Sequence, residues 1–157
     1  MSTEGSKLWV ILAKLSKPNI TLPEIKENYF EAKNLVESIV PDDSDVRTSI
    51  QIFNKGGKLI DKFFHKWQSG QIKPTDEDLD LLEEAFKEAS LAYDFLAINH
   101  SSFFSSDNNK VAQQKLKKVG KIVAEEKQRR QNPNSPNQPS QTNNSNNLFS
   151  KENVFFF

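Results

Sequence analysis

Apolar residues recur every three or four positions along three long segments of this chain, and this spacing limits its possible folds more than any other feature. In residues 22–39 the series is Leu22, Ile25, Tyr29, Ala32, Val36 and Ile39. Residues 45–68 and 76–98 continue it with Val46, Ile50, Phe53, Gly57, Ile60, Phe64 and Trp67, and then Leu79, Leu82, Phe86, Ala89, Tyr93 and Leu96. Such steps give each helix one apolar seam, which is typical of helices packed side by side in a bundle.

The ends of the helices are indicated by capping residues and prolines. We expect helices over residues 6–16, 22–39, 45–68, 76–98 and 108–130. Thr21 with Glu24 forms a capping box, and Thr75 is a good N-cap. Apolar residues beside the seams are expected to widen the buried stripe, namely Phe30, Leu35, Phe63, Leu81 and Phe95. The sequence therefore predicts an all-α, up-and-down bundle of four to five helices in residues 1–130.

The last predicted helix, residues 108–130, has the weakest apolar stripe. Its spaced apolar residues are Ala112, Leu116, Val119 and Val123. A stripe this narrow leaves three arrangements open: loose packing on the bundle, projection as a free helix, or ordering only on a partner.

Two adjacent glycines interrupt the helix predicted over residues 45–68. The segment around Gly56 and Gly57 lacks the spacing of a phosphate-binding loop, and no strand precedes it. We interpret Gly57 as a helix-contact residue on the seam and Gly56 as lying off the seam. Because glycine costs about 1 kcal/mol in a helix interior, a turn that splits this helix is the alternative.

The C-terminal part of the chain has a different composition. Residues 131–147 are rich in Asn, Pro, Ser and Gln, which favours a disordered linker. The peptide 148–157 is apolar again, and its predicted protein-binding residues are Leu148, Phe149, Val154, Phe155, Phe156 and Phe157. It is expected either to dock on a protein or to fold back on the bundle, since aromatic residues often anchor in pockets. One flanking Lys151 gives little attraction to an anionic membrane.

Charge is balanced overall but not locally. The chain has 21 basic and 21 acidic residues, so no general attraction to nucleic acid or membranes is expected. The helix over 108–130 is basic, whereas residues 75–94 are acidic, so the two segments either complement one another or the basic helix follows a phosphate backbone. The residues for the second possibility are Lys110, Lys115, Lys117, Lys118, Lys121, Arg129 and Arg130. This helix lacks an aromatic residue for base stacking.

Catalytic and metal-binding patterns are not found. His65 and His100 lie in different segments without ligand-spaced partners, and the carboxylates of residues 76–98 fall on the polar helix face. We therefore predict no enzyme activity, no metal and no cofactor. The absence of cysteine favours an intracellular, cytoplasmic location. The apolar run 8–13 is too short for a membrane span and lacks the small-residue cleavage site of a signal peptide, so no membrane partner is expected.

These features favour a non-enzymatic protein-interaction or assembly subunit, an adaptor or structural protein that acts through helix faces and the peptide 148–157. Its expected partner is another protein or further copies of itself. The alternative is a small helical nucleic-acid-binding subunit of a larger complex that uses the helix over 108–130. The sequence leaves open whether the terminal peptide docks on its own chain or on another.

Overall fold

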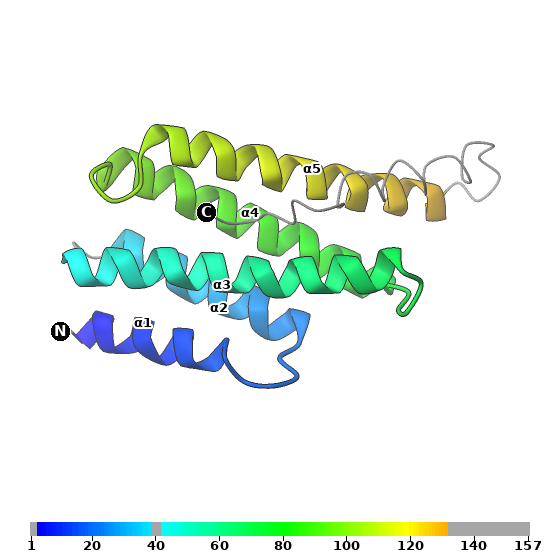
Figure 1. The fold of residues 1–157 in the computed structure, drawn as a ribbon, viewed down its shortest axis with the longest axis horizontal. Coiled ribbons are helices and arrows are strands. Elements are labelled where there is room, and N and C mark those ends of the chain that lie inside the picture. The colour runs from blue at the N-terminus through cyan, green and yellow to red at the C-terminus, as the bar shows by residue number, and fades with distance from the viewer. Residues whose placement is uncertain (1–2, 39–41, 132–157) are drawn as a thin grey trace.

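The computed structural model describes residues 3–38 and 42–131, and all regular elements in these residues are α-helices. The five helices are α1 (Thr3–Lys14), α2 (Leu22–Ser38), α3 (Asp43–Gln68), α4 (Asp76–Asn99) and α5 (Ser106–Gln131). Their axes are nearly parallel and successive helices run in opposite directions (Figure 1). The predicted all-α, up-and-down bundle is confirmed for the described part of the chain.

The helices are not arranged in chain order across the bundle. The central helix is α2, which contacts α1, α3 and α4, while α1 packs against α3 and α5 packs against α4. As a result, α1 and α5 lie at opposite edges of the molecule (Figure 1). The basic helix therefore does not project freely: it buries Ala112, Leu116, Val119, Ile122 and Val123.

Most helix ends lie close to the predicted positions, and capping contacts explain the differences. The helix α3 begins at Asp43 because the side chain of Asp42 accepts from the Asp45 amide at 2.9 Å. The helix α5 begins at Ser106 because the Ser105 hydroxyl accepts from the Asn108 amide at 3.1 Å. Its last residue is Gln131, which the sequence had suggested belonged to the linker.

Both predicted N-terminal caps are present. The amide of Thr21 donates to the Glu24 carboxylate at 3.1 Å, and the amide of Glu24 donates back to the Thr21 hydroxyl at 3.4 Å. Thr75 and Asp78 form an equivalent capping box at the start of α4. The C-terminal end of α1 is Lys14 rather than the predicted residue 16. The loop that follows contains Asn19, which has a φ of 64°.

Aromatic side chains join the inner helices. The ring centroids of Tyr29 and Phe53 are 4.9 Å apart, those of Phe53 and Tyr93 are 5.6 Å apart, and those of Tyr93 and Phe104 are 5.1 Å apart. These rings form a column from α2 through α3 to α4 and the loop beyond it. Since such pairs contribute about 0.5–1.5 kcal/mol beyond their buried area, the column stabilises the centre of the bundle.

Most described residues of the predicted seams are buried in the core, but Leu22, Ile50 and Trp67 are only partly buried. Phe30, expected to widen the buried stripe, is 46% exposed, and the ammonium group of Lys33 lies 5.5 Å from its ring centroid. The other four residues beside the seams, Leu35, Phe63, Leu81 and Phe95, are half-buried. Phe30 shows that an apolar residue beside a seam need not be covered by a neighbouring helix.

The double glycine lies inside an unbroken helix. The helix α3 runs continuously from Asp43 to Gln68, so the alternative of a turn at this point is wrong. The prediction that Gly56 lies off the contact surface is also wrong: a Cβ atom there would be 2.4 Å from Cε1 of Tyr29. The reason is that α3 packs against both α1 and α2 and so buries a wider stripe than one seam. Gly57 is buried too, and its role as a helix-contact residue stays a prediction.

Candidate interaction surfaces

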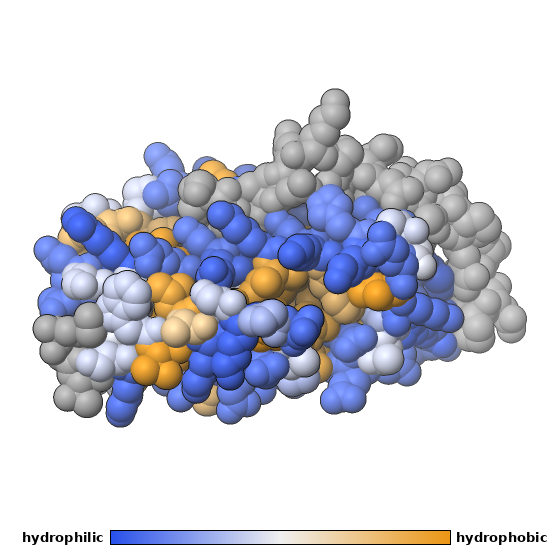
Figure 2. Space-filling model, turned by 60° about the horizontal axis from the view of Figure 1, so that its bottom comes forward, coloured by the Kyte–Doolittle hydropathy of each residue, from blue (hydrophilic) through white to orange (hydrophobic). Residues whose placement is uncertain are grey.

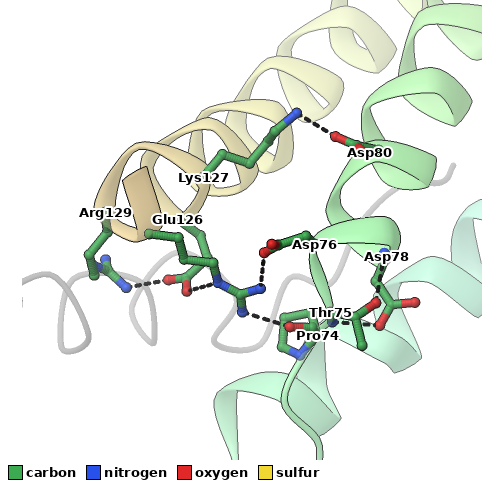
Figure 3. Close-up of polar contacts among 9 residues, drawn as sticks. Pro74, Thr75, Asp76, Asp78, Asp80, Glu126, Lys127 and Arg129 are labelled. Carbon is green, nitrogen blue, oxygen red and sulfur yellow. Dashed lines mark hydrogen bonds and ion pairs between the residues drawn. The ribbon is translucent and has the colours of Figure 1, made fainter. Parts of the chain in front are cut away.

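The end of α5 is attached to the start of α4 by ion pairs (Figure 3). The guanidinium group of Arg130 donates to Asp76 at 2.9 Å, to the carbonyl oxygen of Pro74 at 2.6 Å and to Glu126 at 2.8 Å. Glu126 also pairs with Arg129. Three hydrogen bonds to three different groups fix the position of Arg130, and they connect the last turn of α5 to the first turn of α4.

Lys127 makes a second connection between the same helices. Its ammonium group lies 2.6 Å from Asp80 and 2.6 Å from Glu83. Hydrogen bonds to Asp80 and then to Glu83 raise the pKa of Lys127 well above its usual value. The acidic start of α4 therefore complements the basic end of α5 within one chain, which is one of the two arrangements that the charge pattern had left open.

The rest of the basic surface of α5 faces away from α4. Lys110, Lys117, Lys118 and Lys121 are exposed, and none of them forms an ion pair with another described residue. Lys115 is half-buried. Of the seven residues predicted to bind nucleic acid, four therefore lie on one open surface. Arg129 and Arg130 instead form ion pairs within the fold.

A groove with two adjoining parts lies along α3. One part, of about 540 Å³, is lined by Trp9, Leu12, Ala13, Ser16, Gln51, Asn54, Lys55 and Lys58. A second part, of about 670 Å³, continues past Ser16 and Lys55 to Leu59, Lys62, Phe63, Lys66 and Ile72, with the loop 17–21 on its other side. Ser16 and Lys55 line both parts, so the two parts adjoin at these residues, and we call them together the α1–α3 groove.

The α1–α3 groove exists because its two helices differ in length. The helix α1 has 12 residues and α3 has 26, so α1 covers only about half of α3. Beyond Lys14 a loop takes the place of the helix, and the apolar side chains of Leu59 and Phe63 are only partly covered. Figure 2 shows the side of the molecule on which α1 lies, where apolar surface appears along the middle between hydrophilic side chains.

Four lysines of α3 border this groove: Lys55, Lys58, Lys62 and Lys66. Their spacing of three, four and four positions places them along one side of the helix. No described carboxylate forms an ion pair with any of them. This row of lysines was not singled out from the sequence.

The predicted absence of catalytic and metal sites stays a prediction. Among residues 3–38 and 42–131, no group of three or more His, Cys, Asp or Glu side chains is placed to hold a metal ion. His65 is exposed on α3, and His100 follows the end of α4.

Burial raises the pKa of both Tyr29 and Tyr93. In residues 3–38 and 42–131, no helix is long and apolar enough to cross a membrane.

The predicted protein-binding residues Leu148, Phe149, Val154, Phe155, Phe156 and Phe157 lie outside the described residues, as does the predicted linker after Gln131. Comparison with known protein families, with curated proteins and with solved structures finds no match to this chain.

Proposed function

We propose that this chain is a non-enzymatic protein-interaction subunit, an adaptor or structural component that binds protein through the α1–α3 groove and the terminal peptide Leu148–Phe157. The observation that carries the proposal is the groove itself. Single exposed apolar residues are normal on protein surfaces, but a depression lined by several apolar side chains with lysines along its border is typical of a binding site.

The exposed side chains of α1 support this proposal. Trp9 is 47% exposed and Val10 is 54% exposed. Tryptophan is among the residues most enriched where proteins bind one another, because it buries a large area at little entropic cost. Trp9 lines the groove, so a partner seated there would cover its indole ring.

The terminal peptide is proposed as a second contact with the same or another protein. Residues 148–157 include four phenylalanines, and each gains about 1.5–3 kcal/mol on moving from water to a buried site. Two weak contacts on one chain raise the overall affinity, because the first contact increases the local concentration of the second. We propose that this assembly forms in the cytoplasm, in keeping with a chain that has no cysteine.

The test is purification of the tagged full chain from cells that express it, followed by reconstitution with the purified partner. Truncation after Gln131 removes the terminal peptide and leaves all five helices intact. We expect the full chain to bind one partner at a defined ratio, and the truncated chain to bind it more weakly at unchanged melting temperature. Equal affinity of the two chains would remove the terminal peptide from the proposal. A monomeric chain without any protein partner would contradict the proposal as a whole.

One observation favours a second function. The exposed lysines of α5 form an open basic surface without ion pairs to described residues, which suits contact with phosphates. Binding of nucleic acid by α5 is therefore the second candidate. Its test is the salt dependence of oligonucleotide binding, which is set out among the predictions below.

A further inference from the structure

We infer that the α1–α3 groove binds an acidic amphipathic helix of a partner protein. This inference rests on the proposed function and names the partner's chemistry at one of its two contacts. It follows from the length of the groove, the apolar side chains that line it, and the charge on its border.

The groove has the dimensions of a helix-binding site. Its lining on α3 extends from Gln51 to Lys66, which at 1.5 Å per residue corresponds to about 22 Å, or about four helical turns. Helix α3 forms one side of the groove; the other side is α1 in the smaller part and the loop after α1 with the start of α2 in the larger part. A depression beside a helix can accept the ridge of another helix. An amphipathic helix that lays its apolar face into such a groove is a common mode of recognition.

Apolar side chains lie in both parts of the groove, among polar side chains such as Ser16, Asn19 and Thr21. Trp9 and Leu12 line one part, and Leu59, Phe63 and Ile72 line the other. Asn54 contributes a polar group to the groove: its carboxamide oxygen is buried and accepts no hydrogen bond from a described residue. A partner helix with apolar anchors at positions i, i+3 or i+4, and i+7 would cover these side chains.

The border of the groove requires a negatively charged partner. Lys55, Lys58, Lys62 and Lys66 contribute four positive charges from α3. Asp78 is the carboxylate that lines the same groove, and it already accepts a hydrogen bond from the Thr75 amide at 2.8 Å. Glutamate or aspartate on the outer edges of a bound helix would meet these lysines, whereas a basic helix would be repelled.

A second copy of this chain is a less suitable occupant. Its acidic helix α4 is already engaged within its own fold, because Glu84 pairs with Lys26 at 3.5 Å and Glu88 pairs with Lys33 at 2.7 Å. Asp80 and Glu83 pair with Lys127 in the same way. A phosphate backbone would satisfy the lysines but would leave the apolar side chains of Leu59 and Phe63 uncovered.

The probe for this inference is a synthetic helical peptide of four turns with leucines on one face and glutamates on the other. A matched peptide has glutamine in place of each glutamate. Binding of the labelled peptides to the full chain is followed by fluorescence anisotropy, and the contact is mapped by amide chemical shifts. We expect the acidic peptide to bind about tenfold more tightly than the glutamine peptide, with the shifts confined to α1, α3 and the loop between α1 and α2.

Two pairs of substitutions locate the charge effect. Lys58→Glu with Lys62→Glu reverses two exposed lysines of the groove, and Lys117→Glu with Lys121→Glu reverses two exposed lysines of α5. We expect the first pair to weaken binding of the acidic peptide about tenfold and the second pair to change it less than about twofold. If the first pair does not fold, Lys58→Gln with Lys62→Gln provides the same comparison with neutral side chains.

Several results would overturn the inference. Equal binding of the two peptides, or an equal loss with both pairs of substitutions, would show that the groove has no preference for an acidic helix. Self-association of the free chain that disappears with Lys58→Glu and Lys62→Glu would assign the groove to a second copy. If an oligonucleotide binds more tightly than the peptide, and through the same Lys58 and Lys62, the groove would be assigned to nucleic acid. If the peptide fails while the natural partner still binds through residues 148–157, only this inference falls and the proposed function stands.

Discussion

The ring of Tyr29 lies directly against the backbone of Gly56, so that a methyl group on Gly56 would come within 2.4 Å of the ring. The hydroxyl group of Tyr29 reaches past this point and donates to the carbonyl oxygen of Phe53 at 3.0 Å. The ring of Tyr29 from α2 therefore packs where α3 has no side chain, and its buried hydroxyl group donates to the same helix.

Gly56→Ala should lower the stability of the protein. Alanine normally stabilises a helix relative to glycine by about 0.4–1 kcal/mol, but here the added methyl group collides with Tyr29. Overpacking of this kind costs about 1–3 kcal/mol, which exceeds the helical gain. The free energy of unfolding in denaturant measures the difference.

Gly120→Ala is the matched control for this prediction. Gly120 also lies inside a helix, and, apart from its chain neighbours and the backbone of its own helix, no described atom lies within 4 Å of where its Cβ atom would be. We expect this variant to be more stable than the wild type by about 0.5–1 kcal/mol. Equal effects of the two substitutions would show that Tyr29 does not restrict Gly56.

Arg130→Gln should weaken the attachment of α5 to α4. The substitution removes the ion pairs of Arg130 with Asp76 and Glu126. Since Asp76 is largely exposed, we expect a loss of only about 0.5–1 kcal/mol, and a smaller loss at high salt. Lys121→Gln, which removes an exposed lysine of the same helix without an ion pair to a described residue, should leave the free energy of unfolding unchanged. A larger effect of Lys121→Gln than of Arg130→Gln would contradict the assignment.

The protein should lose stability in alkaline solution because of its two tyrosines. Burial raises the pKa of Tyr29 and of Tyr93 above the ordinary value of about 10. Below that pH both the folded and the unfolded chain keep these protons, so the full stability is present. As the pH rises further, the unfolded chain ionises first and stability falls.

The pH dependence of unfolding, together with tyrosinate absorbance, measures this effect. Tyr93→Phe should make the alkaline loss of stability less steep, because one of the two groups no longer ionises on unfolding. Ionisation of both tyrosines near their ordinary pKa, with the helices still folded, would show that the rings are not buried.

Replacement of Lys117, Lys118 and Lys121 by Gln tests the second candidate function. If α5 binds a phosphate backbone, the variant should bind all oligonucleotide sequences more weakly, and the salt dependence should fall by about 0.7–0.9 per lost contact. We predict the other outcome, in which the wild type does not bind oligonucleotides near physiological salt. Tight, salt-dependent binding by the wild type would make nucleic acid the principal ligand.

The sequence was sufficient to predict the helices because the three-and-four spacing of the seams is a local property that survives packing. It was not sufficient to predict that Gly56 lies in a helix contact, because the contact with Tyr29 depends on how α2 and α3 pack against one another. The same holds for Phe63, which lies on the apolar side of α3 but is left half-buried because α1 ends at Lys14. The lysine row that borders the groove could have been found from its spacing alone, but its meaning depends on the uncovered apolar residues beside it.

The central claim is that a partner protein occupies the α1–α3 groove. The most direct test is a photo-crosslinking amino acid in place of Trp9, introduced into the full chain in cells that express it. The control position is Val111 on α5, which is also exposed, at 39%, but lies at the opposite edge of the molecule. The account predicts one discrete protein adduct from position 9 and none of that mass from position 111. No protein adduct at position 9, or the same adducts from both positions, would contradict it.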